Sequence, residues 1–163
     1  MEKLRELFTT QPGYKMLDIT AHTDGISEML AEALAPVGGR LALAEYPGTH
    51  RTFAVPEGTS LQRQRIDDYA KPFRALPRDN DIVFVRDVLH RHAQPERLLR
   101  AVYTTLANAA EIVVVTRTDD ADAPAQLAML EAADFRAGNV IEGIVEDSVV
   151  VMGKKMHMWG RGL

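Results

Sequence analysis

Hydrophobic residues recur along the chain in two alternating patterns, short continuous runs and helical spacings. Continuous apolar runs are typical of parallel strands that are covered on both faces. They predict strands at residues 14–19, 40–46, 81–85 and 111–116, whose sequences are YKMLDI, RLALAEY, DIVFV and EIVVVT. A weaker candidate strand, RQRIDDY at residues 63–69, lies in the proline-punctuated stretch between the second and third of these runs.

Apolar residues at helical spacing lie between the runs and predict amphipathic helices. The first helix follows the strand at 14–19 and ends at Pro36 and the glycine pair 38–39. Two more begin at Pro95 and Pro124, because proline suits the first turn of a helix. The apolar face of the helix before Pro36 consists of Ile26, Met29, Leu30, Ala33 and Leu34. The face of the helix from Pro95 consists of Leu98, Leu99, Val102 and Leu106, and that of the helix from Pro124 of Leu127 and Leu130. A short helix at the start of the chain is predicted from Leu4, Leu7 and Phe8.

The last part of the chain has a different pattern. Segments 139–147 and 148–155 are β-patterned and closely spaced, which predicts an antiparallel hairpin. Strands that alternate with helices predict an α/β fold with a doubly wound, mostly parallel sheet, and the hairpin gives that sheet an antiparallel end. We expect residues 1–163 to form a single domain. Such sheets bind ligands beyond the carboxyl ends of their strands, so the loops to inspect are 18–25, 45–47, 67–69 and 86–92.

Composition narrows the classes of function. The 163 residues are 46% hydrophobic, and the net charge of −4 gives no general attraction to nucleic acid. A local cluster of Arg86, Arg91, Arg97 and Arg100 is interpreted as a solvated helix face. The absence of cysteine excludes disulfides and thiolate metal sites. A charged beginning and the absence of a long apolar run predict a cytoplasmic protein with no membrane partner.

The order and spacing of the motifs resemble those of the class I S-adenosylmethionine-dependent methyltransferases, above all the small ubiquinone/menaquinone-biosynthesis type. MLDITAHTDGIS at 16–27 is similar to the first motif of that family, a strand that ends in an acid and a glycine-rich turn. LALAEY at 41–46 is similar to its second strand, and IDDYAKPFRALP at 66–77 to the segment after its third. The stretch NDIVFVRDVLHRHAQPERLLRAVYTTL at 80–106 looks like the fourth strand and its helix.

This resemblance implies S-adenosylmethionine as the cofactor and a small molecule as the methyl acceptor. Glu45 would accept hydrogen bonds from both ribose hydroxyls, and Asp68 would face the adenine amine. His90, or else Asp87, is the candidate general base. The implied cofactor-binding residues are Asp18, Thr20, His22, Asp24, Gly25, Glu45, Tyr46, Asp68 and Tyr69.

The first motif departs from the family at its turn, where Thr20, His22 and Asp24 occupy positions that the family keeps as glycine. Glycine there lets the cofactor approach the backbone without a Cβ in the way. Asp24 is expected to cap the next helix, and its charge would repel the carboxylate of the cofactor. Two hypotheses follow: an S-adenosylmethionine-dependent methyltransferase, or a catalytically inactive protein of that fold that acts as a binding or assembly module.

Two further alternatives stay open. If the first and fourth predicted strands are neighbours, His22 and Asp24 would lie near Asp87, His90 and His92, and such side chains suit a metal ion, although we assign no metal ligands. The terminal sequence KKMHMWGRGL at 154–163 has an apolar face and basic ends. It could pack on its own domain or on a second subunit, which would make a homodimer.

Overall fold

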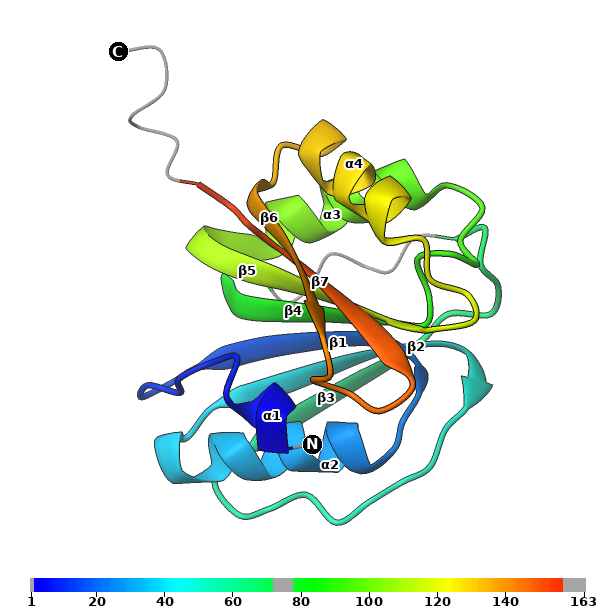
Figure 1. The fold of residues 1–163 in the computed structure, drawn as a ribbon. Helices are drawn as coiled ribbons and strands as arrows, with labels where there is room; N and C mark the ends of the chain where they lie inside the picture. The colour runs from blue at the N-terminus through cyan, green and yellow to red at the C-terminus, as the bar shows by residue number, and fades with distance from the viewer. Residues whose placement is uncertain (1, 72–77, 157–163) are drawn as a thin grey trace.

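The computed structural model describes residues 2–71 and 78–156, in which a sheet lies between two layers of helices (Figure 1). The sheet has seven strands in the order β3-β2-β1-β4-β5-β7-β6. Strands β1 to β5 are parallel to one another, and β7 is antiparallel to both β5 and β6. The predicted α/β fold with an antiparallel end is therefore confirmed. The strands are β1 (Lys15–His22), β2 (Arg40–Thr49), β3 (Ser60–Arg65), β4 (Asn80–Arg86), β5 (Leu106–Arg117), β6 (Arg136–Glu142) and β7 (Ser148–Lys154).

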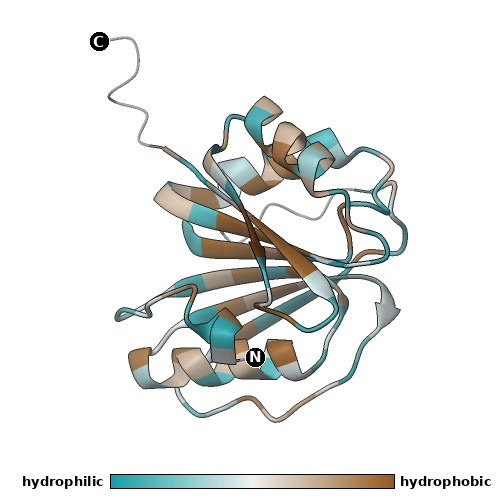
Figure 2. Ribbon diagram, in the orientation of Figure 1, coloured by the Kyte–Doolittle hydropathy of each residue, from teal (hydrophilic) through white to brown (hydrophobic). Residues whose placement is uncertain are grey.

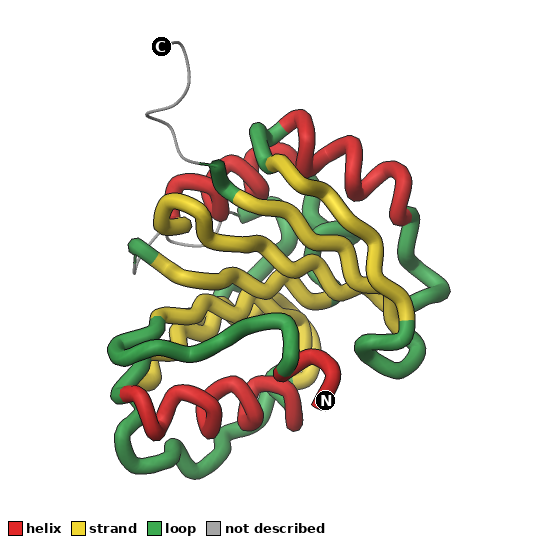
Figure 3. Tube along the Cα trace, turned by 60° about the vertical axis from the view of Figure 1, so that its left-hand side comes forward, coloured by secondary structure: helices red, strands yellow, loops and turns green. Residues whose placement is uncertain are grey.

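Helices cover both faces of this sheet, as Figures 1 and 3 show. Helices α1 (Glu2–Arg5) and α2 (Gly25–Leu34) lie on one face, and the short 3-10 helix η1 (Ala35–Val37) follows α2. Helices α3 (Pro95–Thr105) and α4 (Ala123–Ala132) lie on the other face. None of the helices in the described residues is long and apolar enough to span a membrane.

The hydrophobic core has two parts, because apolar residues of the central strands belong to two separate clusters. Figure 2 shows brown, hydrophobic stretches along these strands. On one side Leu30 and Leu34 of α2 pack with Phe84 of β4. On the other side Leu98 of α3 packs with Val85 of β4. Each central strand thus contributes alternate residues to the two cores, which explains its continuous apolar sequence.

Several predicted boundaries are wrong: β1 runs to His22 rather than residue 19, β2 runs to Thr49 rather than residue 46, and β5 begins at Leu106 rather than residue 111. The third strand is Ser60–Arg65 rather than 63–69, because it pairs in register with β2 from Ser60 opposite Arg40 to Arg65 opposite Glu45. As an edge strand it is mostly exposed, so it lacks the apolar run by which the other strands were recognised. Leu106, expected on the face of the second helix, is in extended conformation and begins β5.

The terminal hairpin is confirmed, since β6 and β7 pair antiparallel around a turn at 143–147. Met152 of β7 is buried in the core beside α2, and Met156 is exposed. Met158 and Trp159, on which the expectation of a homodimer depended, lie outside the described residues.

The direction in which strands are added reverses between β1 and β4. From β1 the chain adds β2 and then β3 on one side, whereas β4 pairs with the other side of β1. His22 and Arg86 end these two strands. In open α/β sheets such a switch point is where ligands bind, so the candidate site is sought there.

Candidate functional site

A buried ion pair joins the two central strands at the switch point. The Nε and Nη2 atoms of Arg86 donate to the two carboxylate oxygens of Asp18, at 2.9 and 2.8 Å. The side chains are only 3% and 0% exposed. Burial by itself would lower the pKa of the Arg86 guanidinium, but the charges of Asp18 and Asp24 outweigh it and hold that pKa above its usual value. Bidentate pairs of this kind are both strong and geometrically specific.

The same guanidinium also holds the turn that follows β1. Arg86 Nη1 donates to Asp24 Oδ1 at 3.1 Å, and Nη2 lies 2.9 Å from both the carbonyl oxygen of His22 and Ser27 Oγ. Asp24 is the N-cap of α2, as expected, and accepts from the backbone N–H of Ile26 at 3.0 Å. The charge of Asp24 is therefore compensated from within the chain, and Arg86 fills the inside of the turn.

Sequence reasoning placed Arg86 wrongly among the solvated arginines. It is the last residue of β4 and is buried, unlike the exposed Arg97 and Arg100 of α3. The sequence feature from which a buried arginine could have been predicted is Asp18, an acid within an otherwise apolar strand. A buried carboxylate requires a partner, and an arginine at the end of the neighbouring strand is well placed to supply it.

A second cluster surrounds Glu45. Arg63 donates to both carboxylate oxygens, from Nε at 3.1 Å and from Nη2 at 2.7 Å, and the Thr23 hydroxyl donates to Oε2. His50 Nδ1 lies 3.1 Å from Oε2. Burial would raise the pKa of the Glu45 carboxyl, but the hydrogen bonds from Arg63 and Thr23 and the nearby charges hold it below its usual value. The side chain is 1% exposed, so both oxygens are engaged inside the protein.

The backbone of β2 closes the crevice between the ends of β1 and β2. Strand β2 continues four residues past Glu45, and the Thr49 carbonyl accepts from the backbone N–H of Thr23 at 3.0 Å. Gly48 lies so close to β1 that a Cβ there would be 1.9 Å from the carbonyl oxygen of Ala21. Only glycine permits this approach, so the backbones of β1 and β2 are in direct contact beyond Glu45.

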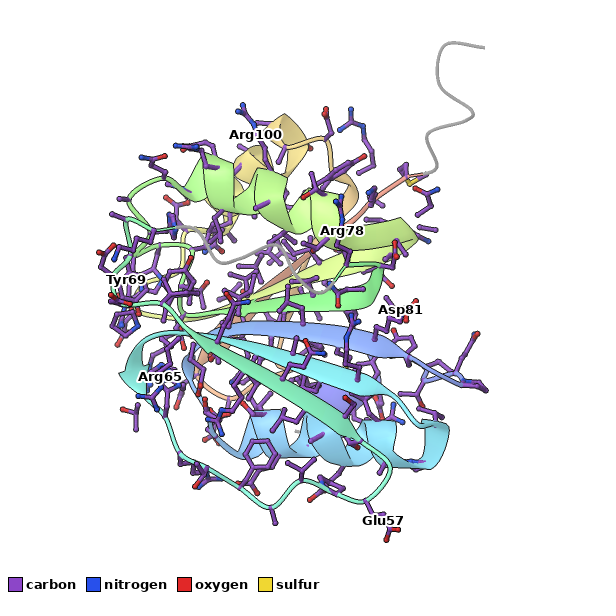
Figure 4. All side chains as sticks on the ribbon, turned by 180° about the vertical axis from the view of Figure 1, so that it is seen from behind. Glu57, Arg65, Tyr69, Arg78, Asp81 and Arg100 are labelled. Atoms are coloured by element: carbon purple, nitrogen blue, oxygen red, sulfur yellow. The ribbon has the colours of Figure 1, made fainter. Side chains whose placement is uncertain are left out.

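Tyr46 and Tyr69, two of the residues expected to bind the cofactor, contact each other. Tyr46 and Tyr69 stack with ring centroids 5.3 Å apart, and His92 meets Tyr46 edge-on at 5.7 Å. The Tyr69 hydroxyl donates to the carbonyl of Pro47 at 2.5 Å; Figure 4 shows Tyr69 at the end of the sheet opposite to Asp81. Asp68 is 51% exposed and accepts a hydrogen bond at 2.7 Å from the backbone two residues later. These contacts form a small aromatic cluster rather than an open slot.

The other predicted residues of the turn make local contacts. The Thr20 hydroxyl lies 2.8 Å from both the backbone nitrogen and the carbonyl oxygen of His22. Gly25 is the first residue of α2. The Thr20 hydroxyl is therefore satisfied by the backbone of the turn itself.

The structure brings His22 and Asp87 together. His22 Nε2 lies 3.3 Å from Asp87 Oδ2, within ion-pair distance but not aligned for a hydrogen bond. Asp87 Oδ1 accepts from the backbone N–H of Arg117 at 2.9 Å. Burial would raise the pKa of the Asp87 carboxyl, but His22 and the Arg117 N–H hold it below its usual value.

The other histidines lie apart from this pair. His90 Nε2 is 3.6 Å from Asp120 Oδ2, and His92 Nδ1 accepts from the backbone of Gln94 at 3.0 Å. In the part of the chain that the structure describes, no three His, Asp or Glu side chains are grouped as metal ligands would be. Of the five His and Asp residues that the sequence predicted to lie together, the structure brings His22 and Asp87 into a close pair.

Comparison with known proteins identifies the fold. No protein-family model and no curated protein sequence matches the chain. Among solved structures it is similar to S-adenosylmethionine-dependent methyltransferases, so its fold is the methyltransferase fold.

Two of these structures match the chain over most of both lengths. One is a SAM-dependent methyltransferase from Aquifex aeolicus, with 17% identity, a TM-score of 0.66, and coverage of 95% of this chain and 89% of that one. Another is the YcgJ protein from Bacillus subtilis, with 12% identity, a TM-score of 0.64, and coverage of 94% and 97%. At this level of identity the likeness shows the fold alone.

Other matches are longer proteins. The phosphoethanolamine N-methyltransferase 2 of Haemonchus contortus, in a complex with S-adenosylhomocysteine, has 12% identity and a TM-score of 0.68; the match covers 96% of this chain and 52% of that one. The chain likewise spans about half the length of the CurJ carbon methyltransferase, 51%.

The residues present do not fit S-adenosylmethionine in the arrangement observed. Glu45, the expected partner of the ribose, has both oxygens engaged. Arg86 fills the turn expected to lie beside the methionyl carboxylate, and Tyr46 and Tyr69, which were also expected to bind the cofactor, stack on each other.

Proposed function

We propose that this chain is a methyltransferase-fold binding module that does not hold S-adenosylmethionine. The observation that supports this most directly is the buried Asp18–Arg86–Asp24 cluster, which fills the turn with the chain's own charges. A cofactor entering there would have to expel the guanidinium. Separating a buried ion pair leaves an uncompensated charge and costs about 3–5 kcal/mol. That penalty would weaken cofactor binding by roughly two to four orders of magnitude.

The extended end of β2 supports the same proposal independently. Residues 46–49 occupy the space beyond Glu45, and Gly48 contacts the backbone of β1. Opening that space would break the hydrogen bond between the Thr23 N–H and the Thr49 carbonyl. The crevice is thus closed at two places, by a side chain at the turn and by the backbone at β2.

A second candidate function is an S-adenosylmethionine-dependent methyltransferase of a small molecule. It is favoured by the structural likeness to proteins solved with the cofactor or its product, such as human N-acetylserotonin methyltransferase with SAM and PigF with SAH. The acids Asp18 and Glu45 also lie in β1 and β2, the strands to which the family resemblance assigns them, although neither acid ends its strand. Both clusters would have to open for binding, and His90 or Asp87 would remain the candidate base.

The finer expectations remain predictions under either function. They are kinship to the ubiquinone/menaquinone-biosynthesis type, a single domain over residues 1–163, a cytoplasmic location, no nucleic-acid partner, and a homodimer formed through the terminal sequence.

Thermal shift with S-adenosylmethionine and S-adenosylhomocysteine separates the two candidates. A ligand at one hundred times its dissociation constant stabilises a fold by about 2.7 kcal/mol, which raises the Tm of a chain of this size by about 5–10 °C. We expect no shift at 1 mM of either compound. A saturable shift that Glu45→Gln abolishes would support the methyltransferase instead, because that variant alters the expected ribose partner.

A further inference from the structure

A cleft lies beside the His22–Asp87 pair and borders the closed crevice, because Asp24, Thr49 and Arg86 line both. It has a volume of about 480 Å³ and lies between the first turn of α2, the segment after β2 and the turn between β6 and β7. Ligand sites for small molecules commonly have volumes of this order. We propose that this cleft binds a small hydroxycarboxylate, with its carboxylate on Arg117 and its hydroxyl on His22. This inference names a ligand class for the proposed binding module and therefore rests on that function.

Neither ring nitrogen of His22 has a hydrogen-bond partner among the described residues. Its Nε2 is buried and lies 3.3 Å from Asp87 Oδ2, at ion-pair distance but without the alignment of a hydrogen bond. The side chain is 28% exposed and lines the cleft. The Asp87 carboxylate beside Nε2 favours the ring tautomer with its proton on that nitrogen, and this tautomer leaves Nδ1 as an acceptor. A ligand hydroxyl can therefore donate to His22 Nδ1.

Asp87 is itself held in place from two directions. Its backbone N–H donates to the Val115 carbonyl at 2.9 Å, and its Oδ1 accepts from the Arg117 N–H at 2.9 Å. Its φ of 56° lies in the left-handed region, which aspartate adopts more readily than most residues but still uncommonly. Non-glycine residues held in such conformations concentrate at functional sites. The pair is thus positioned before any ligand arrives.

Arg117 is the cation of the cleft whose charge is not already compensated. Arg51 pairs with Glu28 at 2.5 Å, and Arg86 pairs with Asp18 and Asp24. The Arg117 guanidinium has no ion-pair partner within residues 2–71 and 78–156. It is exposed at the end of β5 and is available to a carboxylate.

The remaining charges select against strongly anionic ligands. Three arginines and four carboxylates line the cleft, namely Arg51, Arg86 and Arg117 with Asp24, Asp87, Glu146 and Asp147. Because carboxylates slightly outnumber arginines, a dianion such as phosphate is disfavoured relative to a monoanion. Glu146 and Asp147 add hydrogen-bond acceptors, which favour a ligand that also carries a donor.

NMR of the histidine ring nitrogens in the full chain tests the proposal, with lactate, acetate and inorganic phosphate as probes up to 50 mM. We expect lactate to shift the His22 ring saturably, with acetate and phosphate at least threefold weaker. Arg117→Gln should weaken lactate binding at least tenfold, and Asp87→Asn should change the His22 tautomer. His90, which is paired with Asp120 outside the cleft, should not respond. Asp120→Asn is the matched control and should leave the His22 response unchanged.

Three results would overturn the proposal. They are the absence of a saturable His22 shift with lactate, an equal response to acetate, and unchanged lactate binding in Arg117→Gln. Because Arg117 is exposed, its replacement should not unfold the protein, and weaker lactate binding in that variant can be attributed to the lost guanidinium. Titration of S-adenosylmethionine in the same spectra keeps the two proposals apart. Binding of that cofactor would contradict the proposed function, whereas failure of lactate alone would contradict only the assignment of the cleft.

Discussion

At the scale of single residues, two buried carboxylates and the arginines bound to them fill the expected cofactor site. Asp18 and Glu45 were recognisable from the sequence because each acid lies in an otherwise apolar strand. Their partners Arg86 and Arg63 were not recognised, because arginines near strand ends are common on protein surfaces. Only the sheet register, which places Arg86 opposite Thr20 and Arg63 opposite Leu43, brings the guanidinium groups to the acids.

Replacing Arg86 tests the strength of the first pair. Arg86→Met should lower the free energy of unfolding by about 3–5 kcal/mol, because it leaves Asp18 buried without a counter-charge. Urea denaturation measures this loss. Arg136→Ala is the matched control, since that arginine is 55% exposed and 3.8 Å from Asp134, and it should cost less than about 1 kcal/mol. Equal effects in both variants would mean that the buried pair contributes no more than a surface one.

Glu45 makes stability depend on pH. Its pKa is lower in the folded protein than in the unfolded chain, where a glutamate titrates near about 4.3. The unfolded state therefore binds more protons between the two values, so this stabilisation is complete above about pH 5 and is lost as the pH falls through the folded-state pKa. Glu45→Gln should flatten the acid limb of a plot of unfolding free energy against pH. Glu57→Gln, on the exposed segment labelled in Figure 4, should leave that limb unchanged.

At the scale of elements, the apolar pattern predicted the central strands and the main helices. Burial on both faces gives the strands continuous apolar runs, and burial on one face gives the helices apolar residues at helical spacing. The pattern failed at β3, an exposed edge strand, and at the end of β2. There β2 continues through Pro47 and Gly48, residues that favour turns and gave no strand signal. That continuation is what closes the crevice, so the feature most relevant to function was the one that local sequence preference concealed.

Gly48→Ala tests this backbone contact. The added Cβ would lie 1.9 Å from a carbonyl oxygen of β1, so the end of β2 must move away, at a cost of about 1–3 kcal/mol. We expect faster hydrogen exchange at the Thr23 N–H, which donates to Thr49. Gly138→Ala is the control, because the atom nearest to its Cβ is the movable Cδ2 of Leu127 at 3.0 Å. Unchanged exchange at Thr23 in Gly48→Ala would contradict the close packing of the two strands.

At the scale of the whole molecule, the methyltransferase fold is retained while the cofactor crevice is filled. Order and spacing of motifs sufficed to predict the fold, since they reflect the alternation of strands and helices. They could not show whether the crevice is open, because that depends on side chains from strands distant in sequence. Fold and activity are separate properties of a chain.

A variant with small residues at the turn after β1 tests whether the backbone of β2 alone prevents cofactor binding. His22→Gly/Asp24→Gly/Arg86→Ser returns the turn to small residues but leaves residues 46–49 in place. We expect no S-adenosylmethionine binding by thermal shift, because the backbone of β2 still closes the crevice. Addition of Gly48→Ala to displace that segment should then raise affinity, and binding in the triple variant alone would show that the turn is the only barrier.

The central claim is that the chain's own charges and backbone occupy the cofactor crevice. Calorimetric titration of the unaltered protein with S-adenosylhomocysteine tests it most directly. We expect no saturable heat up to 1 mM ligand. A single-site isotherm with a Kd below 100 μM would contradict it.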